Sequence, residues 1–172
     1  MKFYFNQHIS LISFLIIPLV MFWHPSWLSL MGYQAYWPIF WLLPWALIHG
    51  PYKAMLFGFL LGFTLDTINA DLYTQIPGLM ICGFWFSKIG NFSQFNNTPL
   101  QFGLIAAIGS LICGILYFCQ IVVQHLIGNS PLWLFSFGVQ NIFSQVFLTG
   151  LLAPVFCKWL YVLFSKKYKL KI

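Results

Sequence analysis

Arginine and glutamate are absent from this chain, and aspartate occurs only at Asp66 and Asp71. Charged residues make up 6% of the 172 residues, whereas about 25% is usual in soluble domains. Hydrophobic residues make up 60%. This composition excludes an ordinary soluble domain and predicts one polytopic membrane domain over residues 1–172. The eight lysines are scattered through short loops, so membrane topology explains the net charge of +6 better than nucleic-acid binding does.

Familiar catalytic signatures are also absent. The sequence has no P-loop, Gly-x-Gly-x-x-Gly, His-Glu-x-x-His or Gly-x-Ser-x-Gly motif. The four cysteines lie in apolar runs without Cys-x-x-Cys spacing and are expected to be small buried hydrophobes. The four histidines fall in four different segments near expected membrane surfaces. We therefore expect no catalytic residue, no cofactor and no metal site. A polytopic lipid enzyme is an alternative that would require turnover depending on single polar residues.

Apolar runs predict six membrane-spanning helices in a compact all-α bundle, at residues 3–23, 33–48, 54–72, 73–87, 100–124 and 132–156. The first is expected to remain uncleaved, because no small-residue cleavage site follows it. The second is short and interrupted by Pro38 and Pro44, so by itself it could be re-entrant. The apolar pattern of the sixth continues to residue 164, and Gly150 and Pro154 are expected to kink it or mark its exit.

The lysines favour an even number of crossings. With six spans and a cytoplasmic N-terminus, Lys2, Lys53, Lys88, Lys158 and the lysines of the C-terminal tail all face the cytoplasm. The opposite loops contain no lysine. A re-entrant second span would separate Lys53 from the tail and remove this bias. The positive-inside rule therefore predicts that both termini are cytoplasmic and that Asp71 lies at the outer surface.

The segment 53–71 contains the strongest candidate site. Gly58, Gly62 and Asp66 recur at i, i+4 and i+8, so they form one stripe on a helix. The glycines allow the backbone of a neighbouring helix to approach closely. Asp66 lies about 20 Å along the helix from Lys53, roughly two thirds of the way through a hydrocarbon core of about 30 Å. Its carboxylate should therefore face protein rather than lipid.

A polar stripe on the sixth span is the expected partner of Asp66. Asn141, Gln145 and Thr149 follow the same i, i+4, i+8 spacing. Helix packing or a partner interface is favoured over transport chemistry, because one lone carboxylate makes a poor proton relay. The alternative is a substrate-capture site, in which Asp66, Asn141 and Gln145 line a closed polar cavity.

The proline-interrupted second span and the sequence GPYKAMLFGFLLGFTLDTINADLYTQIPGLM after it resemble the bacterial rod shape-determining protein MreD family. The matching positions are Pro38, Gly58, Gly62 and Asp66, with an early Asn141, a late Pro154 and a basic tail around the sixth span. One position differs: members usually carry glycine eight residues after the aspartate, where this chain has Thr74.

The resemblance implies a non-enzymatic, multi-pass subunit of the cell-elongation machinery, which organises peptidoglycan synthesis at the bacterial inner membrane. The implied partners are membrane lipids and a single-span periplasmic coiled-coil protein, MreC, and through it MreB, RodA and a penicillin-binding transpeptidase. The family is similar to the six-helix substrate-binding subunits of energy-coupling-factor transporters, which gives the alternative function. The residues expected to form a helix-packing or partner interface are Gly58, Gly62, Asp66, Asn141, Gln145 and Pro38.

Overall fold

A computed structural model describes residues 29–30, 33–69, 73–90, 98–128 and 133–169. Within these residues the protein is all-α, apart from a minimal antiparallel strand pair, β1 (Ser29–Leu30) and β2 (Tyr33–Gln34). The helices in chain order are α2 (Trp37–Ile48), α3 (Pro51–Asn69), α4 (Ile76–Gly90), α5 (Pro99–Gly128) and α6 (Trp133–Lys169). The expected first span, residues 3–23, lies outside the described residues.

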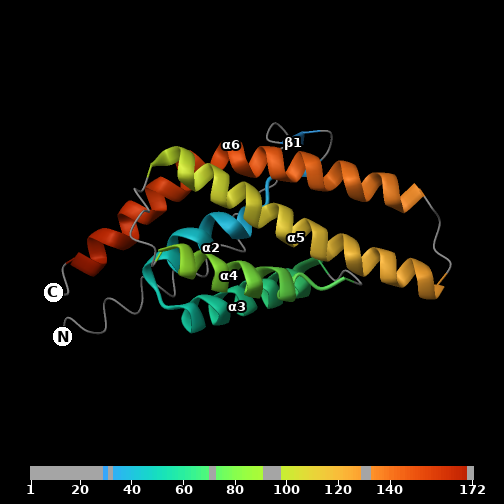
Figure 1. Ribbon diagram of the computed structural model, residues 1–172, viewed down its shortest axis with the longest axis horizontal. Helices are drawn as coiled ribbons and strands as arrows, with labels where there is room; N and C mark the ends of the chain where they lie inside the picture. Colours follow the sequence, from blue (N-terminus) through green and yellow to red (C-terminus); the bar gives the residue numbers. More distant parts are fainter. Residues whose placement is uncertain (1–28, 31–32, 70–72, 91–97, 129–132, 170–172) are drawn as a thin grey trace.

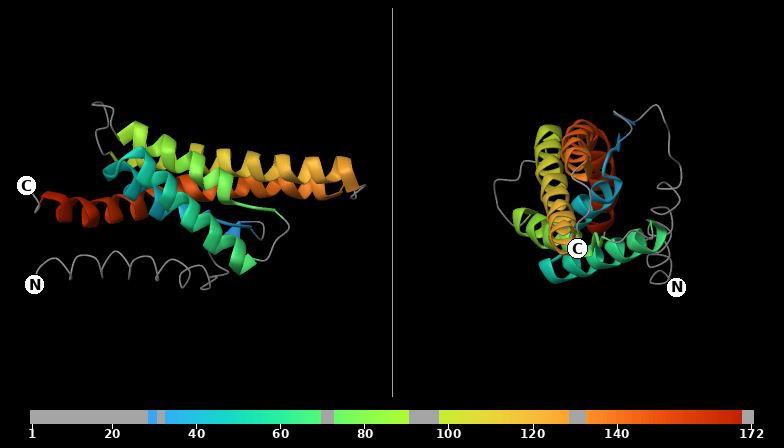
Figure 2. Two further views of the ribbon diagram at one scale, coloured as in Figure 1. Left: turned by 90° about the horizontal axis from the view of Figure 1, so that it is seen from below. Right: turned by 90° about the vertical axis from the view of Figure 1, so that its right-hand side faces the viewer.

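The helices form two antiparallel hairpins with α2 between them (Figure 1). Helix α3 packs on α4 and helix α5 packs on α6, while α4 also contacts α5. Helix α2 contacts all four of the other described helices. The two views of Figure 2 show α5 and α6 running side by side, with α3 inclined to them.

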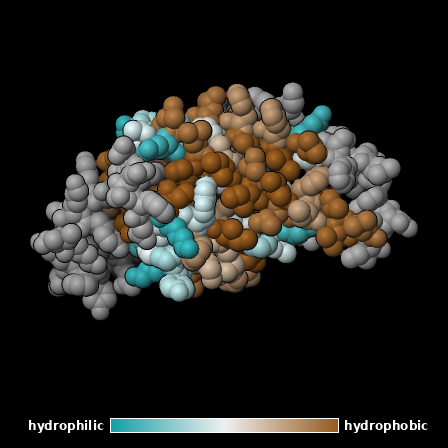
Figure 3. Space-filling model, viewed as in Figure 1, coloured by the Kyte–Doolittle hydropathy of each residue, from teal (hydrophilic) through white to brown (hydrophobic). Residues whose placement is uncertain are grey.

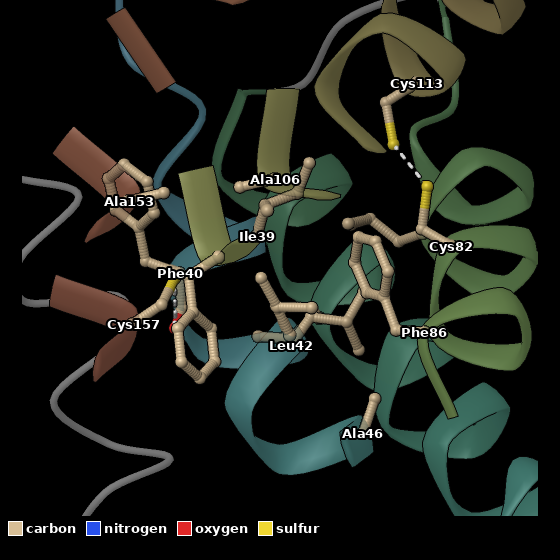
Figure 4. Close-up of a cluster of buried hydrophobic side chains, with 14 of the residues drawn as sticks. Ile39, Phe40, Leu42, Ala46, Cys82, Phe86, Ala106, Cys113, Ala153 and Cys157 are labelled. Carbon is tan, nitrogen blue, oxygen red and sulfur yellow. Dashed lines mark hydrogen bonds between the residues drawn. The ribbon is translucent and has the colours of Figure 1, made fainter. Parts of the chain in front are cut away.

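The core is built around α2, whose residues are apolar on every side. Its buried residues are Pro38, Ile39, Phe40, Leu42, Leu43, Pro44 and Ala46. Figure 4 shows several of them meeting side chains from α4, α5 and α6. Phe40 stacks on Phe156 of α6, with ring centroids 5.7 Å apart. Pro38 lies in the first turn of α2, where a helix has no use for its missing N–H, and Pro44 is tolerated inside the helix because the surrounding helices enclose it.

Two described segments are long and apolar enough to cross a membrane, Pro99–Val123 of α5 and Gly138–Phe164 of α6. Helices α2 and α4 are also apolar but have only 12 and 15 residues, or about 18 and 22 Å. Helix α3 has 19 residues, or about 28 Å. These findings agree with a membrane protein, and they distinguish two long helices from three shorter ones.

Large apolar side chains are exposed along α3, α5 and α6, and Figure 3 shows such a surface on one face. On α6 they recur every four residues, at Val139, Phe143, Phe147, Leu151, Val155, Trp159 and Leu163. Phe143 is 77% exposed. Soluble monomers rarely expose contiguous apolar patches of this extent, so the surface agrees with the membrane association that the composition predicts.

Helix α6 continues through Pro154 to Lys169. No described helix therefore ends near Gly150 and Pro154, where the span was expected to kink or to leave the membrane. Pro154 removes the hydrogen bond that would reach the carbonyl of Gly150. This carbonyl faces α5 at Gly103, where an added methyl group would lie 2.9 Å from the Gly150 oxygen. The absence of a side chain at Gly103 lets α5 pack against this part of α6, and the packing supports the continuous helix.

The start of α3 and the end of α4 lie together at one end of the bundle (Figure 1). The Ser87 hydroxyl of α4 donates to the carbonyl of His49, between α2 and α3, at 2.6 Å. Lys53 in the first turn of α3 and Lys88 in the last turn of α4 therefore share this end, which we call the lysine end. The opposite end, where α3 ends and α4 begins, contains Asp66 and is called the Asp66 end.

Candidate functional site

The glycine stripe of α3 packs against α4 inside the hairpin. A methyl group on Gly58 would collide with the backbone oxygen of Leu79, and one on Gly62 would lie 2.6 Å from the Cα of Ile76. Both obstacles are backbone atoms, which cannot rotate away as a side chain can. The sequence did not distinguish packing within the bundle from packing against a partner protein. In the structure both glycines pack within the bundle, against α4.

Asp66 lies in the last turn of α3 and is half-buried. Its Oδ1 accepts a hydrogen bond of 2.9 Å from the backbone N–H of Gln75, the residue immediately before α4. The first N–H groups of a helix lack acceptors within the helix, so the side chain of Asp66 supplies one at the start of α4. The expectation that α6 supplies the partner is wrong for this bond, because α3 packs on α4 and its carboxylate closes their common turn.

A chain of hydrogen bonds continues from Gln75 to α6. The side-chain oxygen of Gln75 accepts a bond of 2.8 Å from the hydroxyl of Tyr36. The backbone N–H of Tyr36 donates to the hydroxyl oxygen of Thr149 at 2.9 Å. The polar stripe of α6 is therefore linked to Asp66, but through the residue that precedes α2 rather than directly.

A second pair of bonds holds the same turn to α5. The Gln120 side chain accepts a bond from the N–H of Thr74 at 2.9 Å and donates one to its carbonyl at 2.8 Å. One amide group thus binds both backbone groups of an exposed residue in an irregular segment. The end of the α3–α4 hairpin is held by α5 as well as by Asp66.

A cavity of about 320 Å³ lies at the Asp66 end, between the two hairpins. It exists because α2 is short: the 12-residue helix fills only part of the length between the hairpins, and residues 35–38 at its start line the cavity. Side chains from α3, α4, α5 and α6 also line it. The polar residues at its wall are Tyr36, Thr74, Gln75, Tyr117, Asn141 and Gln145.

The candidate residues from the sequence divide into two groups. Asn141, Gln145 and Pro38 meet at the cavity. Gly58 and Gly62 lie within the α3–α4 contact instead, and Asp66 is not among the residues that line the cavity. The substrate-capture alternative therefore retains a cavity with two carboxamides, but without the acid that it was expected to contain.

Sequence reasoning missed Gln75 and Tyr36, which connect Asp66 to the rest of the bundle. Gln75 binds Asp66 through its backbone N–H. Every residue except proline has this group, so the sequence does not single out Gln75. One signal was available: Pro77 lies in the first turn of α4, and proline is favoured at helix starts. A helix start near residue 75 identifies backbone N–H groups that need an acceptor from outside the helix.

Three of the four cysteines, Cys82, Cys113 and Cys157, are buried, as expected, but Cys119 is exposed on α5. The sulfur atoms of Cys82 and Cys113 lie 3.5 Å apart, in hydrogen-bond contact, and all four cysteines are free.

Comparisons with protein-family models, curated proteins and solved structures find no match to this chain.

Proposed function

We propose that this chain is a non-enzymatic scaffold subunit of the bacterial cell-elongation machinery, similar to the MreD family. In this proposal the chain crosses the inner membrane six times, with both termini in the cytoplasm. It binds an MreC-like protein with one span and a periplasmic coiled coil, and through it MreB, RodA and a penicillin-binding transpeptidase. Its role is to hold these partners together during peptidoglycan synthesis.

The observation that carries the scaffold role is the use of Asp66. This residue is the single carboxylate in the part of the chain that the structure describes, and it accepts the N–H of Gln75. A catalytic acid or a proton relay needs a carboxylate aimed at a substrate or at a second titratable group. A carboxylate that closes a helical hairpin supports a structural protein better than an enzyme or a proton-coupled transporter.

The distribution of charge supports the proposed topology. Lys53 and Lys88 lie at one end of the α3–α4 hairpin, and Asp66 lies near the other. Under the positive-inside rule the lysine end faces the cytoplasm. Because the glycine face of α3 is filled by α4, the span of a partner packs on another apolar surface of the bundle.

The proposal is tested by co-expressing the chain with an MreC-like protein from the same genome and purifying the pair through a tag on the chain in mild detergent. We expect a stable complex that survives gel filtration. Asp66→Leu should reduce the yield of folded complex, while Asp66→Asn should be milder because an amide oxygen still accepts the N–H of Gln75. A correctly folded chain that elutes without the MreC-like protein contradicts the proposal.

The second candidate function is a substrate-binding subunit of a membrane transporter, and the cavity favours it. Its volume of about 320 Å³ is at the lower end of the range for small-molecule sites, about 300–1,000 Å³. This function requires solute uptake that depends on Asn141 and Gln145. Unchanged uptake of every solute after deletion of the chain, together with a change in cell shape, would favour the scaffold role.

A further inference from the structure

Two carboxamides at the cavity wall have no hydrogen-bond partner among the described residues. Asn141 and Gln145 are four residues apart on α6, about 6 Å along the helix axis, and both are half-buried. Each offers one acceptor oxygen and two donor N–H groups. Gln75 is a third carboxamide at the wall, and its oxygen already accepts a bond from the hydroxyl of Tyr36.

Charged side chains are absent from the wall of this cavity, as far as the structure describes it. An ionic ligand would lose its hydration without gaining a counter-charge, and such a transfer is strongly unfavourable. Asp66 lies outside the wall and accepts the N–H of Gln75. Its negative charge interacts with Tyr36 at the wall and adds to the cost for an anion. The cavity therefore selects against carboxylates and phosphates.

The remainder of the wall suits a flat apolar group. Aromatic side chains from two places in the chain line it, namely Tyr36 and Trp37, and Tyr117 and Phe118. Gly138 also lines it and packs closely on the ring of Phe118, where an added methyl group would lie 2.9 Å from a ring carbon. Aromatic rings of a protein pack favourably against planar groups in offset or edge-on arrangements. Size, apolar walls and two unpaired amides together define one class of ligand.

We propose that the cavity binds a small, uncharged, planar molecule that carries an amide or lactam group. The apolar ring of the ligand packs among the aromatic side chains, and its amide exchanges hydrogen bonds with Asn141 and Gln145. A site built to pair with a hydrogen-bonding group rejects analogues that lack this group, because its own polar atoms then stay unpaired. This inference does not rest on the scaffold role, since a ligand at this site is compatible with a scaffold or with a transporter.

The test uses three ligands with one ring and one fluorine label: 4-fluorobenzamide, 4-fluorobenzoate and 4-fluorotoluene. Binding to the full-length protein in nanodiscs is followed by fluorine NMR, with empty nanodiscs as the reference for partition into lipid. We expect saturable binding of 4-fluorobenzamide, with an affinity at least tenfold higher than that of the other two. No saturable binding of the amide overturns the proposal. Equal binding of 4-fluorotoluene also overturns it, because the cavity is then only an apolar void.

Variants of α6 identify the groups that bind the amide. Asn141→Leu and Gln145→Leu should each weaken 4-fluorobenzamide binding at least tenfold. Gln140→Leu is the matched control, because Gln140 is exposed on the same helix and does not line the cavity; its affinity should stay within twofold of the original. Circular dichroism and gel filtration show whether each variant is folded. Folded Asn141 and Gln145 variants that bind the amide as well as the original protein contradict the assignment.

Discussion

Replacing Gly62 with alanine is the sharpest perturbation of the α3–α4 hairpin. The added methyl group would lie 2.6 Å from the Cα of Ile76 and 3.0 Å from its backbone nitrogen. Favourable contacts between carbon atoms occur at about 3.5–4.0 Å, so the start of α4 must move away by roughly 1 Å. Ile76 follows Gln75 directly, and the same movement therefore strains the bond between Gln75 and Asp66.

The expected cost follows from these contacts. Overpacking of this kind costs about 1–3 kcal/mol, and the higher helix propensity of alanine returns up to about 1 kcal/mol. We expect Gly62→Ala to lower the free energy of unfolding by about 1–2 kcal/mol. The matched control is Gly114→Ala on α5, where the closest atom is a side-chain carbon of Ile142 at 3.0 Å. A side chain can adjust, so the control should lose less than about 1 kcal/mol.

The assay is equilibrium unfolding in mixed micelles with increasing dodecyl sulfate, followed by far-ultraviolet circular dichroism. Coupling is measured by repeating both glycine substitutions in an Asp66→Asn background. The loss caused by Gly62→Ala should be smaller in that background, because part of the strained bond is already weakened. Gly62→Ala with the stability of the original protein, or with the same loss in both backgrounds, would refute the close packing and its connection to Asp66.

Three further predictions concern other contacts of the bundle. Asp66→Leu should cost about 1–3 kcal/mol because the N–H of Gln75 loses its partner, and Asp66→Asn should cost less; equal losses in dodecyl sulfate unfolding contradict this role. Gln120→Leu removes both bonds to Thr74, which are exposed to solvent, and should cost about 0.5–1.5 kcal/mol, seen as faster proteolysis at the α3–α4 turn; an unchanged cleavage rate contradicts it. Burial lowers the pKa of His49 below its ordinary value of 6.5. As the pH falls, His49 is therefore protonated in the unfolded chain before it is protonated in the folded chain. Stability should therefore be complete above pH 6.5 and decrease below it, and His49→Gln should reduce this dependence; an identical pH profile in the variant contradicts the assignment.

The helical organisation was accessible from the sequence where a pattern depends on a single helix. Gly58 and Gly62 lie on one face of α3 because their spacing matches the helical repeat, and glycine at such spacing is useful only where a backbone approaches. The polarity of the hairpin was accessible for the same kind of reason, since Lys53 and Lys88 fall at predicted helix ends.

Features that depend on two or more helices were not accessible. The partner of Asp66 is a backbone N–H, and every residue except proline has one, so residue identity could not select it. The continuation of α6 through Pro154 depends on Gly103 of α5, about fifty residues earlier in the chain. The cavity depends on the length of α2 relative to its neighbours, and this length becomes meaningful only when the helices are packed.

The orientation of α3 tests the account most directly, because Gly62, Asp66 and the proposed topology all require this helix to cross the membrane. With the four native cysteines replaced by alanine, single cysteines are introduced as Tyr52→Cys at the exposed start of α3 and as Thr74→Cys in the exposed turn before α4. A membrane-impermeant maleimide is then applied to intact spheroplasts. The account predicts labelling at position 74 without lysis and at position 52 only after lysis. Labelling of both positions from the same side of the membrane would contradict it.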